Sequence, residues 1–166
     1  MPEKETIRRA ARDKRQGKSA STQAGEFVRE EIHHVREGKH GARSTKQAIA
    51  IGLAKARRQG VKLPAPKKGE APAATRKKAA KDVAAGRRPK KSVSRTRSRA
   101  SRAALKDEGH AAASHTALSR QATKAAKQRT ARDRSAAAKK ASRTKGAAKR
   151  SAAAKKAART RARRGH

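Results

Sequence analysis

The chain has 166 residues, and 49 Lys and Arg against 12 Asp and Glu give it a formal net charge of +37. Ile, Leu, Val and Phe number only 14, about 8% of the residues, whereas compact domains usually contain more than about 20%. The absence of cysteine excludes disulfides and thiolate metal sites. So few large apolar residues cannot offset the entropy of ordering the whole chain, and we expect a small core and a polyanionic partner.

The large apolar residues and the charge are distributed in opposite ways along the chain. Residues 1–63 hold ten of the 14 large apolar residues and carry a net charge of +9, whereas residues 64–166 carry +28. We therefore predict a mostly α-helical fold, in which a small helical head at 1–63 is built from one helix and a helical hairpin. A Pro/Ala/Lys-rich linker is predicted at 64–93. The Ala/Lys/Arg-rich arm at 94–166 is expected to be largely disordered or conditionally helical.

Start and stop signals place three helices in the head. The first is predicted at about 2–16 and the second at about 22–37, each followed by a glycine. Ser44 and Gln47 have the spacing of a capping box that opens the third helix. Gly60, followed by an apolar residue, is typical of a Schellman stop at the end of that helix.

The second and third predicted helices are expected to fold back on each other and form the core of the head. Each buried side chain contributes roughly 1.5–3 kcal/mol before entropy is subtracted. A domain this small is marginal, so a homodimer through the face carrying Ile49 and Leu53 is an alternative to a monomer. The residues predicted to pack together are Phe27, Val28, Ile32, Val35, Ile49, Leu53, Val61 and Leu63, with Ile7 beside them.

The loop at 38–45 lies between these helices and ends at a helix N-terminus, where free N–H groups attract anions. We hypothesise a phosphate contact there, and a simple interhelical turn punctuated by glycine is the alternative. The loop also has the GxxG spacing found between two helices in KH RNA-binding domains, although no strands are predicted to flank it. The candidate phosphate-binding residues are Lys39, His40, Arg43 and Lys46.

The basic arm is organised around a repeated block. RSAAAKKASRT at 134–144 recurs as RSAAAKKAART at 150–160, and Gly146 lies between the copies. In an unbroken helix an offset of 16 residues would place the two Lys-Lys pairs about 160° apart around the axis. We therefore predict helical pieces hinged near Gly146. Ser94–Lys106 can also be helical, with Arg95, Arg99, Arg102 and Lys106 on one stripe, and Ser114 is expected to cap a further helix.

Catalysis and metal binding are poorly supported by the sequence. No Ser lies in a nucleophile elbow, and we interpret Glu26, Glu30, Glu31 and Glu37 as solvent-exposed ion pairs on the second helix. The histidines lack ligand-like spacing. We predict no enzyme activity, no metal site, no cofactor and no small-molecule substrate.

The head sequence STQAGEFVREEIHHVREGKHGARSTKQAIAIGLAKARRQGVKLP resembles an uncharacterised family of small basic bacterial proteins, whose members combine such a core with a basic tail. That family has no established activity to transfer. The tail is similar in composition to the Ala/Lys arms of linker histones and bacterial histone-like proteins, and this likeness implies DNA coating and compaction. The chain lacks the winged-helix signature of linker histones.

We therefore expect a nucleoid-associated protein that binds duplex DNA without sequence preference and neutralises, compacts or bridges it. An RNA- or ribosome-associated structural protein and a protein adaptor tethered to DNA are the alternatives. The absence of a long apolar run and of a signal-peptide core favours the cytoplasm and no membrane partner. The predicted nucleic-acid-binding residues are Arg87, Arg88, Lys90, Lys91, Arg95, Arg99, Arg102, Lys139, Lys140, Arg143, Lys155, Lys156, Arg159, Arg161, Arg163 and Arg164.

Overall fold

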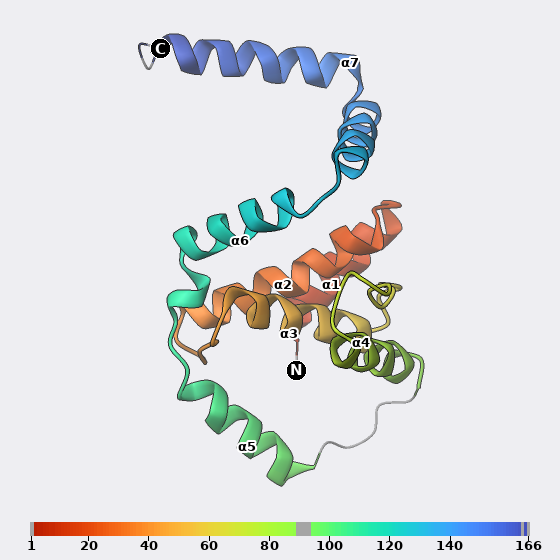
Figure 1. Cartoon of the computed structure of the whole chain (residues 1–166), viewed down its shortest axis with the longest axis vertical. Helices are drawn as coiled ribbons and strands as arrows, with labels where there is room; N and C mark the ends of the chain where they lie inside the picture. Colours follow the sequence, from red (N-terminus) through yellow and green to blue (C-terminus); the bar gives the residue numbers. More distant parts are fainter. Residues whose placement is uncertain (1, 89–93, 164, 166) are drawn as a thin grey trace. The chain divides into compact units, whose positions relative to one another are not determined.

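The computed structural model describes residues 2–88, 94–163 and 165, and it divides into two compact units, Met1–Gln121 and Ala122–His166. The described residues form helices and contain no strand. Among these helices, none combines the length and apolar character that crossing a lipid bilayer would take. The elements are α1 (Lys4–Arg15), α2 (Ala20–Arg36), α3 (Thr45–Arg58), α4 (Ala73–Gly86), α5 (Arg95–Lys106), the 3-10 helix η1 (Ala111–Ala113), α6 (His115–Lys127) and α7 (Ala131–Arg163) (Figure 1).

The predicted hairpin of α2 and α3 is confirmed as the centre of the first unit. Ser44 caps α3 by accepting a hydrogen bond from the backbone N–H of Gln47 at 3.2 Å. At the other end Gly60 adopts a φ of 83°, and Val61 donates its N–H to the carbonyl of Ala56 at 3.1 Å, as a Schellman stop requires. α1 packs on α2, and α4 packs on α3.

The core of this unit is made largely of alanine. One cluster combines Phe27 with three buried alanines, and Leu53, Val61 and Leu63 pack partly buried against it. The other cluster is built on Ile32 and Val35. Ile7, which we expected beside the core, is instead 37% exposed.

Helix α4 lies within the segment predicted as a linker, yet it packs on α3. Ala79 and Asp82 are its buried residues. The Asp82 carboxylate accepts a hydrogen bond from Arg58 Nε at 2.7 Å. Arg57 is also buried, and burial lowers the pKa of its guanidinium while Asp82 opposes that shift. At the end of α4, a Cβ on Gly86 would lie only 2.1 Å from the Arg57 carbonyl oxygen, so the two backbones meet closely.

The 3-10 helix η1 also belongs to the core, although it is far from α2 and α3 in sequence. Ala113 is fully buried against the cluster of Ile32 and Val35. Thr45 Oγ1 donates to the carbonyl of Ala112 at 2.7 Å, and Arg36 Nε donates to the carbonyl of Ala113 at 2.8 Å. Small residues and two polar side chains therefore hold this segment in place.

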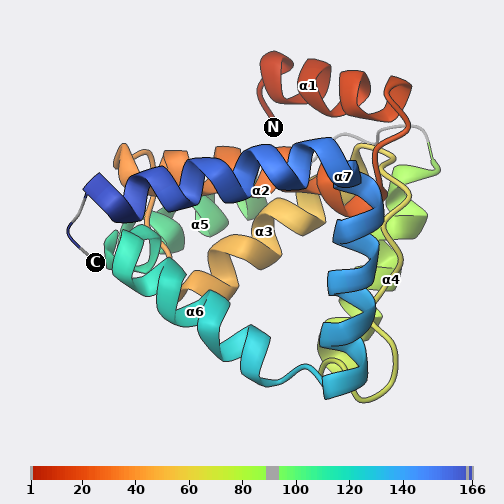
Figure 2. The same ribbon diagram turned by 90° about the horizontal axis from the view of Figure 1, so that it is seen from above.

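In the second unit, α7 extends from Ala131 to Arg163, with a kink at Gly146, whose φ of 66° and ψ of 166° are not helical (Figures 1 and 2). The hinge predicted at Gly146 is thus confirmed. The prediction of a largely disordered or conditionally helical arm is wrong, because this segment and α5 are helical. The physical reasons are local: alanine has the highest helix propensity, and Thr130 Oγ1 accepts a hydrogen bond from the Asp133 N–H at 3.1 Å at the start of α7.

Candidate nucleic-acid interface

Helix α7 is a cationic helix with no buried face. Of its residues whose side chains are described, all are exposed except Ser142, which is partly exposed. The helix carries thirteen Lys and Arg and a single acid, Asp133, which lies in its first turn. The described side chains of α7 therefore take no part in a core and are accessible to a partner.

Three cations of the second segment of α7 lie on one side of the helix. Lys149, Lys156 and Arg163 recur every seven residues, so their directions drift by only about 20° per step. Arg159 lies about 60° from Lys156 around the axis, and Lys155 lies about 100° from it. We call Lys149, Lys156 and Arg163 the distal stripe. Arg161 is exposed elsewhere on the same segment.

The first segment of α7 carries a shorter stripe. Arg132, Lys139 and Arg143 are separated by seven and four residues, which places them within about 40° of one another. We call them the proximal stripe; Lys140 lies beside them, also exposed. Across the kink, Arg150 Nη1 donates a hydrogen bond to Ser142 Oγ and so connects the two segments.

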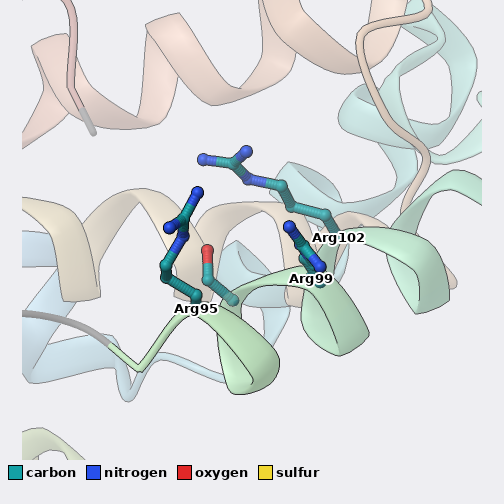
Figure 3. Close-up of a pocket in the computed structure, with 4 residues that line it drawn as sticks. Arg95, Arg99 and Arg102 are labelled. Carbon is teal, nitrogen blue, oxygen red and sulfur yellow. The ribbon is translucent and has the colours of Figure 1, made fainter.

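In the first unit, Arg95, Arg99 and Arg102 line a pocket on α5 together with Ser98. Figure 3 shows Arg95 and Arg102 extending from the same side of α5, with Arg99 between them. This grouping brings together the three arginines of the predicted stripe, whereas Lys106 does not line the pocket. None of the three makes an ion pair with another residue of the described chain. Three uncompensated guanidinium groups around one hollow favour an anionic ligand.

The C-terminal end of α5 is fixed to the loop at 38–44. Gly41 donates its N–H to the carbonyl of Leu105 at 2.7 Å, and Ala42 donates to the carbonyl of Gly109 at 3.0 Å. A Cβ on Gly41 would lie 1.6 Å from the Glu108 carbonyl oxygen, so glycine is required at this contact.

The four candidate phosphate-binding residues of this loop do not share one environment. Lys39 forms ion pairs with Glu3 at 3.3 Å and Glu37 at 3.0 Å, and these hydrogen bonds, Glu37 first, raise the pKa of Lys39. His40 is turned inward. Arg43 is 82% exposed and pairs with Glu108 at 3.3 Å. Lys46 is exposed at the start of α3. A phosphate contact here remains a prediction, with Arg43 and Lys46 the residues most available for it.

The remaining predicted residues lie at the ends of helices. Arg87 and Arg88 are exposed directly after α4. Lys90, Lys91 and Arg164 lie outside the described residues.

The sequence interpretation missed a buried polar cluster between α2 and the loop. Glu30 and Glu31 were expected to be exposed, but their side chains are only 2% and 1% exposed. Lys55 Nζ lies 2.5 Å from Glu31 Oε2, and His40 Nε2 lies 3.2 Å from Glu31 Oε1. The available signal was periodicity, because both glutamates follow Phe27 by three or four residues and so share its inward side of the helix.

Comparison with known proteins places a family match on part of the first unit. Neither a curated protein nor a solved structure matches the chain. Residues 4–68, which include α1, α2 and α3, match the model of a family of unknown function, DUF6496.

Proposed function

We propose that this protein binds duplex DNA along its phosphate backbone, without sequence preference, and that α7 is the main contact. The observation that carries the proposal is a helix with thirteen cations and one acid, in which none of the side chains that the structure describes is buried. Ordering so many like charges along one helix is unfavourable in isolation, and a polyanion relieves that repulsion. The net charge of +37 on the whole chain favours the same class of partner.

The spacing of the cations matches the spacing of phosphates. Ala147–Arg163 contains seven Lys and Arg, and its 17 residues span about 25 Å, so one cation occurs every ~3.6 Å. One DNA strand carries a phosphate about every 3.4 Å of helix axis. Over the same length, α7 therefore carries about as many cations as one DNA strand carries phosphates, and counterion release drives the association.

Binding is expected to be blind to base sequence. Base-edge readout needs a few ordered Arg, Asn or Gln side chains on an element docked in a groove. The cations of α7 are Lys and Arg side chains interspersed with alanine. This pattern suits contacts to phosphates rather than to the edges of base pairs. We place the arginine pocket of α5 as a second phosphate contact. Two contacts on one chain allow bridging of duplexes, and such a protein would be found on the nucleoid.

The distal stripe is tested by a triple substitution, Lys149→Gln, Lys156→Gln and Arg163→Gln. Removing three phosphate contacts should make the slope of log K against log salt shallower by about 2.7 and weaken binding at fixed salt. The matched control is Arg8→Gln, Arg12→Gln and Arg15→Gln, which removes the same charge from exposed positions of α1. If the control weakens duplex binding as much as the stripe variant, α7 is not the interface.

Competition separates DNA from RNA as the partner. The full-length protein is bound to a labelled duplex and challenged with unlabelled duplex DNA or structured RNA at equal phosphate concentration and equal salt. We expect duplex DNA to compete better. Tighter competition by structured RNA would transfer the proposal to RNA.

A further inference from the structure

The buried cluster at the C-terminal half of α2 contains an excess of negative charge in a strongly basic protein. The carboxylates of Glu30 and Glu31 are buried there, those of Glu3 and Glu37 lie half exposed at its edge, and two ammonium groups, of Lys39 and Lys55, oppose the four. The cluster therefore has a formal charge of −2 when its imidazoles are neutral. Two of its carboxylates are almost fully buried, and a buried charge needs a compensating cation.

Two imidazoles face these carboxylates. His34 Nε2 lies 2.9 Å from Glu3 Oε1 and 3.9 Å from Glu30 Oε1, and its ring meets that of His40 edge to face at a centroid distance of 6.0 Å. The ligand atoms of Glu31, His34 and His40 all lie within 4.8 Å of one another. Two imidazole nitrogens and a carboxylate oxygen are a donor set that suits Zn²⁺.

The hydrogen bonding of His40 leaves one ring nitrogen for a cation. His40 Nδ1 lies 3.0 Å from the carbonyl oxygen of Gly41, and because a carbonyl can only accept, Nδ1 carries the proton. In the neutral ring Nε2 then has a lone pair, and it points at Glu31 Oε1, 3.2 Å away. Two lone pairs at that distance repel unless a positive charge lies beside them. Metal-binding histidines commonly donate their other N–H to a backbone carbonyl in this way.

We propose that Glu31, His34 and His40 bind a divalent transition metal, with Zn²⁺ the best match. Bond lengths of about 2.0–2.2 Å place the ligands of a tetrahedral site roughly 3.4 Å apart, close to the observed separation of Glu31 Oε1 and His40 Nε2. Glu30 Oε2 is also buried without a hydrogen-bond partner and adds to the uncompensated negative charge beside these ligands. Lys55 holds the other oxygen of Glu31 and orients that carboxylate. A divalent ion cancels the charge of −2.

The metal would act as a structural clamp. Its ligands come from α2 and from the loop at 38–44, and the same loop holds the end of α5 through Gly41 and Ala42. Glu31 and His34 lie three residues apart on α2, whereas His40 lies in the loop that follows. The sequence does not reveal this site, because only the turn after α2 brings His40 back to these two side chains.

The test uses the full-length protein, stripped with a chelator and titrated with Zn²⁺ by calorimetry. We expect one Zn²⁺ per chain and a rise in Tm. His34→Ala and His40→Ala should each weaken Zn²⁺ affinity at least tenfold. His33→Ala is the matched control, because His33 adjoins His34 but is exposed, and it should bind Zn²⁺ like the wild type. Circular dichroism of each variant verifies that the helices remain.

Titration of the wild-type protein with Co²⁺ provides a second readout that needs no variant. Tetrahedral coordination should give intense visible d–d bands, which added Zn²⁺ removes. The proposal is overturned if the wild type binds no stoichiometric Zn²⁺, if His33→Ala weakens binding as much as His34→Ala and His40→Ala, or if Co²⁺ gives only weak octahedral bands. Failure to bind the metal would leave the DNA-binding proposal unaffected.

Discussion

Gly52 in α3 faces the backbone of α2, and it sets how closely these two helices approach. A Cβ at this position would lie 2.6 Å from Val28 Cα and 3.0 Å from the Phe27 carbonyl oxygen. Real side chains do not tolerate such contacts, and backbone atoms of a packed helix cannot move aside cheaply. The close approach in turn allows Ala48 and Ala56 to be fully buried, so that small residues build a core from few large ones.

Substitution of Gly52 tests this packing directly. Gly52→Ala should force α2 and α3 apart and destabilise the protein by about 1–3 kcal/mol, as overpacking does. Gly25→Ala in α2 is the matched control, because a Cβ there meets nothing within 4 Å. It should stabilise by about 0.5–1 kcal/mol through helix propensity alone. Thermal and urea denaturation measure both. Equal effects of the same sign would contradict the packing described here.

At the scale of secondary structure, the helix boundaries follow from local chemistry. Ser44, Ser94 and Ser114 were predicted to start helices, and each accepts a hydrogen bond from a backbone N–H three residues later. These signals could be predicted because a cap involves only a few neighbouring residues. The docking of α4 and η1 could not, because their buried residues are alanines and Asp82, which give no apolar periodicity in the sequence.

The kink in α7 gives an element-scale prediction. Gly146→Ala should favour continuous helix, since alanine disfavours a φ of 66° and no neighbour lies within 4 Å of the added Cβ. The proximal and distal stripes would then lie about 120° apart around one straight helix, and one duplex would contact mainly a single stripe. We expect more helix by circular dichroism and a salt slope shallower by about 3.

Gly165→Ala is the control for this substitution. Gly165 has a similar φ of 70° and equally open surroundings, but it lies beyond the distal stripe. It should leave the salt dependence unchanged. An unchanged slope for Gly146→Ala, together with the expected gain of helix, would show that the kink does not serve DNA binding.

At the scale of the whole molecule, we predicted that a folded N-terminal part precedes a more basic C-terminal part, but we placed the end of the folded part too early in the chain. Residues 1–121 form one compact unit that includes four segments beyond residue 63, among them α4, α5 and η1. The remaining unit, from residue 122, carries 17 Lys and Arg against one acid. The number of large apolar residues alone underestimates the ordered part of this chain, because buried alanines, close backbone contacts at glycines and polar hydrogen bonds order the rest.

The buried cluster of Glu30 and Glu31 illustrates the same limit. From the sequence we expected these glutamates at the surface, because glutamate is rarely buried without a partner. Their partners are Lys55 from α3 and His40 from the loop, and only the folded chain brings these together. His40 was predicted to contact phosphate, but in the folded chain it lies beside Glu31. The arginine stripe of α5 could be predicted, because its residues lie within one helix.

The central claim is that α7 and its neighbouring cations bind DNA through its phosphates, and the salt dependence of that binding tests it most directly. The affinity of the full-length protein for a short labelled duplex is measured by fluorescence anisotropy over a range of salt concentrations. Engagement of about ten phosphates predicts a slope of log K against log salt near −9. A slope shallower than about −3 would contradict the account, because so few released counterions could not represent binding by α7.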